Sequence, residues 1–149
     1  MATLLLATVL GAVLSAIIGT FWYMEKTPMG KIHMKYLGFD KLSHEEQKKL
    51  IEEMKPKMWK YYALQMALSM LTAFAVVFIV IMSTVNGLPF IVTVGFVTMN
   101  WLCFMVPVVG SALLWGNCDR KIVWKKFFYD ILANLVTVIA IAGMTLLFI

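Results

Sequence analysis

The sequence predicts an all-α protein: a four-helix transmembrane bundle with a helical cytoplasmic segment between the first and second helices. Of the 149 residues, 62% are hydrophobic and only 14% are charged. The mean hydropathy of +0.86 is far above that of a soluble domain. The apolar residues also form four blocks, each about as long as a helix that crosses a bilayer. We therefore expect residues 1–149 to form a single membrane domain.

The first apolar block, residues 2–24, would form a helix about 34 Å long, enough to cross about 30 Å of hydrocarbon. It begins without a basic residue and ends in Trp22 and Tyr23, which is not the pattern of a cleaved signal peptide. We therefore keep this block as a span of the mature protein. The other three spans are predicted at about residues 59–82, 89–115 and 127–149.

Two further signals concern the second and third spans. Asn86-Gly87 favours a turn, so these spans should form a tight antiparallel hairpin. Pro107 should kink the third span and free a carbonyl group near residue 103.

The segment at residues 25–58 predicts two short helices. Pro28 suits a first helical turn and Gly38 a stop, so a short interfacial helix is expected between them. Ser43 and Glu46 have the spacing of a capping box, which predicts a second helix near residues 44–55. We expect Pro56 to interrupt that helix.

The distribution of charge predicts the orientation in the membrane. Nine lysines lie between residues 26 and 60, and the other four of the thirteen basic residues lie between residues 120 and 126. Basic residues are retained on the cytoplasmic side, so both termini should face outward. Membrane lipids are expected partners, and the basic residues expected to face them are Lys31, Lys35, Lys125 and Lys126. Because six acidic residues lie among the nine lysines, an ordinary solvated face is the alternative.

Polar side chains inside the spans are candidate functional residues, because such groups are unfavourable at membrane depth. The candidates are Gln65, Ser69, Asn100, Asp130 and Asn134. They would either line a pathway or form interhelical hydrogen bonds that stabilise packing. Lys126 precedes Asp130 by four residues, so these two side chains can pair near the interface.

The first span has small residues at four-residue intervals, which permit close approach of another helix. These residues are Ala7, Gly11, Ser15 and Gly19. We expect this face to make a close helix contact, either within one chain or between subunits.

The sequence contains no nucleophile paired with a base, no metal-binding cluster and no phosphate-binding loop. We therefore expect no enzyme activity and no cofactor. A membrane enzyme would have to depend on Cys118, Asp130, His33 and His44, and both histidines are expected to face water. Nucleic acid is not an expected partner, because basic and aromatic residues do not alternate.

The order of several short motifs resembles the bacterial membrane family called domain of unknown function 1761. The motifs are Gly19-Thr-Phe-Trp22-Tyr23, Lys60-Tyr61-Tyr62-Ala63, Trp101 with Pro107, and Phe127-Phe128-Tyr129-Asp130. The resemblance covers nearly the whole chain. It implies a four-helix membrane protein and supplies no activity. We expect the protein to lie in the bacterial inner membrane.

Together these features favour a non-catalytic integral membrane protein, acting as a homo-oligomer or as an accessory subunit of a larger membrane assembly. The alternative is a small oligomeric channel or transporter that uses the polar faces of the second to fourth spans.

Overall fold

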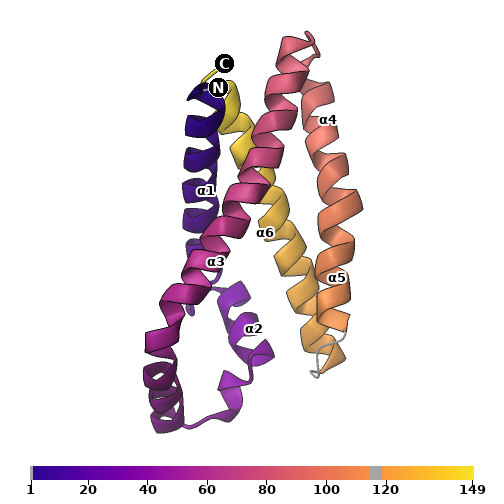
Figure 1. Ribbon diagram of the computed structural model, residues 1–149. Coiled ribbons are helices and arrows are strands. Elements are labelled where there is room, and N and C mark those ends of the chain that lie inside the picture. Colours follow the sequence, from indigo (N-terminus) through magenta and orange to yellow (C-terminus); the bar gives the residue numbers. More distant parts are fainter. Residues whose placement is uncertain (1, 115–118) are drawn as a thin grey trace.

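The computed structural model is all-α and describes residues 2–114 and 119–149 (Figure 1). It contains four helical stretches that are long and apolar enough to cross a membrane, as the sequence predicts. The first is α1 (Ala2–Trp22), the second is α3 (His44–Val85) and the fourth is α6 (Arg120–Leu146). The third consists of α4 (Phe90–Asn100), a π-helical turn η2 (Trp101–Met105) and α5 (Val106–Leu114). Trp115, the predicted end of the third span, and Cys118 lie outside the described residues.

The centre of the bundle is packed from small and β-branched side chains of α1, α3, α4 and α6. The buried apolar residues of this core are Ala7, Ala12, Ala73, Val76, Val77, Val80, Val97, Val138, Ile141 and Ala142. Small side chains let helix axes approach closely, and such contacts stabilise packing where lipid competes for apolar surface. The three helices α1, α3 and α6 all contact one another in pairs.

The turn between α3 and α4 has the predicted chemistry. Asn86 ends α3, and Gly87 adopts φ 67°, a left-handed conformation that glycine accepts without strain. The Gly87 and Leu88 N–H groups donate to the carbonyl oxygens of Thr84 and Ser83. The two helices therefore return antiparallel as a hairpin, with both arms visible in Figure 1.

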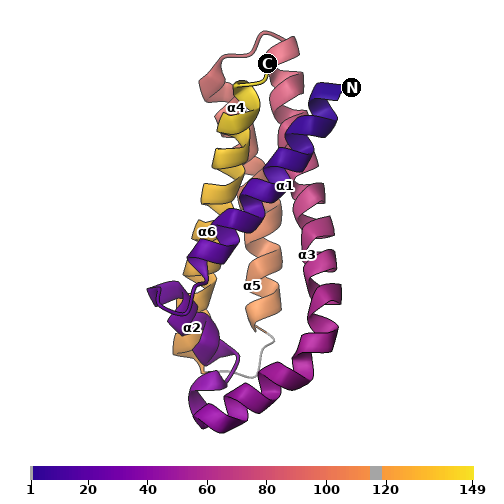
Figure 2. The same ribbon diagram turned by 90° about the vertical axis from the view of Figure 1, so that its left-hand side faces the viewer.

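The expected interruption at Pro56 is wrong, because α3 is a continuous helix from His44 to Val85 with Pro56 inside it. The capping box at its start is present, with Ser43 and Glu46 bonded in both directions. Proline removes one backbone hydrogen bond and bends a helix without always ending it. Figure 2 shows the first part of α3 running at a steep angle to its long apolar part.

The predicted disturbance at Pro107 takes the form of a π-helical turn. In η2 the Val106 N–H donates to the carbonyl oxygen of Trp101, five residues back instead of four. Pro107 has no N–H to continue the preceding hydrogen-bond pattern, and the wider turn accommodates that loss within one continuous span.

A short helix, α2 (Pro28–Tyr36), lies beside the lower part of α6 in both views (Figures 1 and 2). Thr27 caps its start by accepting a hydrogen bond from the Gly30 N–H at 2.9 Å. Gly38 follows its end at φ 79°, as predicted, and a 3-10 turn, η1 (Phe39–Lys41), leads toward α3. Both ends of the described chain lie at the opposite end of the bundle (Figures 1 and 2).

Candidate functional site

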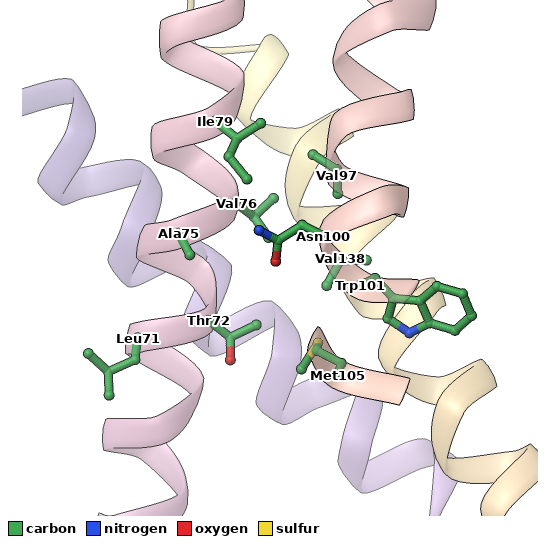
Figure 3. Close-up of a pocket in the computed structure, with 10 residues that line it drawn as sticks. All are labelled: Leu71, Thr72, Ala75, Val76, Ile79, Val97, Asn100, Trp101, Met105 and Val138. Carbon is green, nitrogen blue, oxygen red and sulfur yellow. The ribbon is translucent and has the colours of Figure 1, made fainter. Parts of the chain in front are cut away.

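A groove lies between α3 and the third span, with α6 contributing to its lining (Figure 3). We call it the Asn100 groove, and its volume is about 260 Å³. It is lined by Leu71, Thr72, Ala75, Val76, Ile79, Val97, Asn100, Trp101, Met105 and Val138. None of these residues is charged, so the groove suits an apolar or neutral polar group.

Asn100 supplies the side-chain amide of this groove. Figure 3 shows this amide directed from α4 across the groove toward α3. Within residues 2–114 and 119–149, no hydrogen bond joins the Asn100 side chain to another group, unlike the polar side chains of Trp101 and Asn134. Thr72 also lines the groove, but its hydroxyl donates to the Leu68 carbonyl oxygen at 3.2 Å. The Asn100 amide is therefore free to donate to and accept from a partner.

The π-helical turn and α6 together position Asn100. Trp101 follows Asn100 directly, and its indole Nε1–H donates to the carbonyl oxygen of Ile131 on α6 at 3.2 Å. This bond attaches the start of η2 to α6. Single π-helical turns occur frequently at functional sites.

A second polar site lies at the end of the bundle where α2 packs. Lys126 Nζ lies 2.6 Å from Asp130 Oδ2, which confirms the pair predicted from four-residue spacing. The Tyr23 hydroxyl donates to Asp130 Oδ1 at 2.5 Å. Lys126 and Asp130 are only 8% and 9% exposed, so this is a buried ion pair. Buried charges are tolerated when they are paired and hydrogen-bonded, as both are here.

Two tyrosine rings complete the surroundings of the lysine. Lys126 Nζ lies 5.4 Å from the Tyr23 ring centroid and 5.3 Å from the Tyr36 ring centroid. Both distances fall within the range of a cation–π interaction. Since Tyr23 follows α1, Tyr36 ends α2 and Lys126 belongs to α6, this lysine joins three elements. We call Tyr23, His33, Tyr36, Lys126 and Asp130 the Lys126 cluster.

His33 belongs to this cluster and does not face water as expected. Its ring centroid lies 5.1 Å from that of Tyr23, and within the described chain its Nδ1 is buried without a hydrogen-bond partner. Burial, and secondarily the charge of Lys126, lower the pKa of His33, while Asp130 opposes this effect. His33 is therefore stabilised as a neutral ring. His44, by contrast, is exposed at the start of α3.

The other predicted polar residues are placed separately. Gln65 is exposed on α3, and Ser69 is buried one turn further along. The Asn134 amide donates to the Asp130 backbone carbonyl oxygen at 2.9 Å, a bond within α6. The candidate residues therefore do not form one continuous path. Asp130 is paired with Lys126 and Tyr23, and Asn100 lines a separate groove.

The small-residue face of α1 divides into a packed part and an open part. A Cβ at Gly11 would lie 3.1 Å from both Ala73 and Ile141, so glycine permits this contact with α3 and α6. Ser15 is half-buried. A Cβ at Gly19 would meet no atom within 4 Å among the described residues.

Of the four basic residues expected to face lipid, Lys31, Lys35 and Lys125 are exposed. Lys126 is a correction: its side chain is buried against Asp130 and the two tyrosines. Asp130 explains the difference: it lies one turn further along on the same face of α6, and its carboxylate draws the ammonium inward.

Sequence reasoning missed Tyr23, His33 and Tyr36 as members of one site. Tyr23 and Asp130 are 107 residues apart, so no helical spacing relates them. The signal that was available is local: His33 and Tyr36 lie three residues apart and can share a face of α2.

Within the part of the chain that the structure describes, no group of three or more His, Cys, Asp or Glu side chains could hold a metal ion. Comparison with known proteins found a match to the family model "Protein of unknown function (DUF1761)" over residues 6–146. No curated protein and no solved structure matches the chain. Because the family match extends over nearly the whole chain, this protein belongs to the DUF1761 family.

Proposed function

We propose that this chain is a non-catalytic subunit of the bacterial inner membrane, with both termini outside. It acts by association of its transmembrane helices, either as a homo-oligomer or as an accessory subunit of a larger membrane assembly. The observation on which the proposal depends is the Asn100 amide on the third span, which has no hydrogen-bond partner among the described residues.

The third span has the least contact with the rest of its own chain. Only 11% of its apolar window is buried, against 22% to 33% for the other three. Lipid chains can cover apolar side chains, but they offer no hydrogen bond to an amide. A helix that brings a polar group to Asn100 would both cover this span and satisfy the amide.

The Lys126 cluster supports a structural role for the other end of the bundle. Asp130 is the carboxylate that sequence reasoning offered for a pathway, and it is already bonded to Lys126 and Tyr23. An ion or proton pathway through Asp130 would have to break both bonds. The cluster instead joins α1, α2 and α6, which suits a stable platform for assembly.

The distribution of charge supports the orientation. The lysine-rich segment of α2, η1 and early α3 lies at one end of the bundle, and the termini lie at the other (Figures 1 and 2). In the proposed orientation the basic end faces the cytoplasm. Exposed Lys31, Lys35 and Lys125 would then lie near anionic lipid headgroups.

The test is the mass of the particle after extraction from its own membrane in a mild detergent and transfer to lipid discs. A single chain has a mass of 16.9 kDa. We expect a protein mass above that of one chain, and a lower mass for Asn100→Leu. A wild-type particle that contains one chain and no other protein in lipid discs at every concentration would contradict the proposal.

A further inference from the structure

We propose that the partner of the third span is a second copy of this chain, with the two Asn100 amides hydrogen-bonded to each other across a two-fold axis normal to the membrane. This inference rests on the proposed function and names its partner.

Asn100 lies near the middle of the membrane. The third span runs from Phe90 to Ser111, and Asn100 lies ten residues from its start. At about 1.5 Å per residue this is about 15 Å, or half of a hydrocarbon layer of about 30 Å. Water is scarce at that depth, so the exposed amide needs a protein or ligand partner.

The side-chain amide of Asn100 can pair with an identical amide. An asparagine side chain contains both a carbonyl acceptor and an N–H donor, so two asparagines can exchange a pair of hydrogen bonds. All copies of one chain insert with the same orientation, which brings Asn100 of each copy to the same depth. A two-fold axis normal to the membrane therefore places the two amides at equal depth, and the side chain turns from the groove toward the partner.

The surface around Asn100 is exposed and carries no charge. Phe96 and Phe104 lie about one turn before and after Asn100 and are 53% and 67% exposed. Cys103, which follows Asn100 by three residues, is also exposed. Residues 90–111 include no Asp, Glu, Lys or Arg. An apolar surface with one central amide is self-complementary, whereas a charged partner would find no counter-charge on this span.

The experiment uses Cys103 as a reporter of the interface. In full-length Cys118→Ser protein, Cys103 is the remaining cysteine, because the chain has two. Membranes are treated with copper phenanthroline, which oxidises two neighbouring thiols to a disulfide. We expect a cross-linked dimer at Cys103, and co-purification of two differently tagged copies expressed together.

Asn100→Leu is the test variant, Asn100→Gln keeps the amide, and Gln65→Leu removes an exposed amide from α3. Two interhelical hydrogen bonds of the strength found in membrane proteins correspond to about an eightfold change in association constant. Asn100→Leu should therefore reduce cross-linking and co-purification several-fold, while Asn100→Gln restores part of both. Gln65→Leu should match the wild type.

Folding is checked by the thermal unfolding of each variant in detergent, so that loss of association is scored only for variants that unfold like the wild type. If Asn100→Leu fails this check, Asn100→Gln is compared with the wild type instead. Its longer side chain displaces the amide, so its cross-linking should be reduced but not lost. Cross-linking that is equal in the wild type and Asn100→Leu would overturn the inference. A large assembly in which two tagged copies never co-purify would also overturn it, but would leave the proposed function in place.

Discussion

Lys126 shows how one side chain can connect three elements of a small membrane bundle. Its ammonium is paired with Asp130 and lies near two tyrosine rings, one after α1 and one in α2. The four-residue spacing predicted the pair, but burial of the pair depended on α2, which covers it. Since a buried ion pair gains little net free energy from its own attraction, its importance lies in what happens when one partner is removed.

Replacing Asp130 by Asn should therefore destabilise the protein strongly. The substitution leaves the Lys126 ammonium buried without a counter-charge, which costs about 3 kcal/mol of unfolding free energy. Denaturant unfolding in detergent micelles measures this effect. Lys125→Met, at the exposed neighbouring position, is the control and should be nearly neutral. The double variant Lys126→Met with Asp130→Leu should lose less stability than Asp130→Asn, and a larger loss would refute the argument.

Gly30 is the second position where one atom decides local structure. A Cβ there would lie 1.9 Å from the Met24 carbonyl oxygen, a backbone atom that cannot move aside without shifting the chain. Gly30→Ala should lower the free energy of unfolding by at least about 2 kcal/mol. It should also expose α2 to trypsin at Lys31 and Lys35. Gly19→Ala is the matched control, because open space surrounds its Cβ position; equal behaviour of the two variants would contradict this prediction.

At the scale of elements, the serine cap and the glycine stop followed from local chemistry, whereas the effect of Pro56 did not. The capping box at Ser43 and the stop at Gly38 lie where the sequence indicated. Pro56 did not end its helix, because the neighbouring turns of α3 keep their own hydrogen bonds and a bend absorbs the lost one. A proline removes one backbone hydrogen bond, and whether the helix ends there depends on the hydrogen bonds of the turns on either side.

The docking of α2 should depend on pH through His33. Its pKa is lowered from the ordinary value of 6.5 in the folded protein. As pH falls below about 6.5, the unfolded chain therefore binds a proton before the folded protein does, and the free energy of unfolding decreases. Thermal unfolding in detergent between about pH 7.5 and about pH 5.5 should show this decrease.

Substitution isolates the contribution of His33 to this pH dependence. His33→Gln should make the decrease in unfolding temperature smaller, because the ring that resists protonation is gone. His44→Gln is the control, since His44 is exposed and lies outside the Lys126 cluster. If His33→Gln and His44→Gln have the same pH dependence as the wild type, the coupling between His33 and folding is absent.

At the scale of the whole molecule, the four apolar spans could be predicted because bilayer thickness fixes the length of an apolar helix. The groove at Asn100 could not, although Asn100 itself was identified as a polar residue at depth. Its walls depend on the relative placement of α3, η2 and α6, and residues such as Thr72 and Val138 have no sequence relation to Asn100. Tyr23 and Asp130 likewise meet only after the chain has crossed the bundle several times.

The last prediction concerns the orientation of the whole bundle. In a protein without its own cysteines, made by Cys103→Ser and Cys118→Ser, single cysteines are introduced as Asn86→Cys and Lys49→Cys. Asn86 lies at the turn between α3 and α4, while Lys49 lies in the lysine-rich start of α3. Because basic segments are retained in the cytoplasm, a membrane-impermeant thiol reagent should label only Asn86→Cys in intact spheroplasts. In inverted vesicles it should label only Lys49→Cys, and the reverse pattern would show that the termini face the cytoplasm.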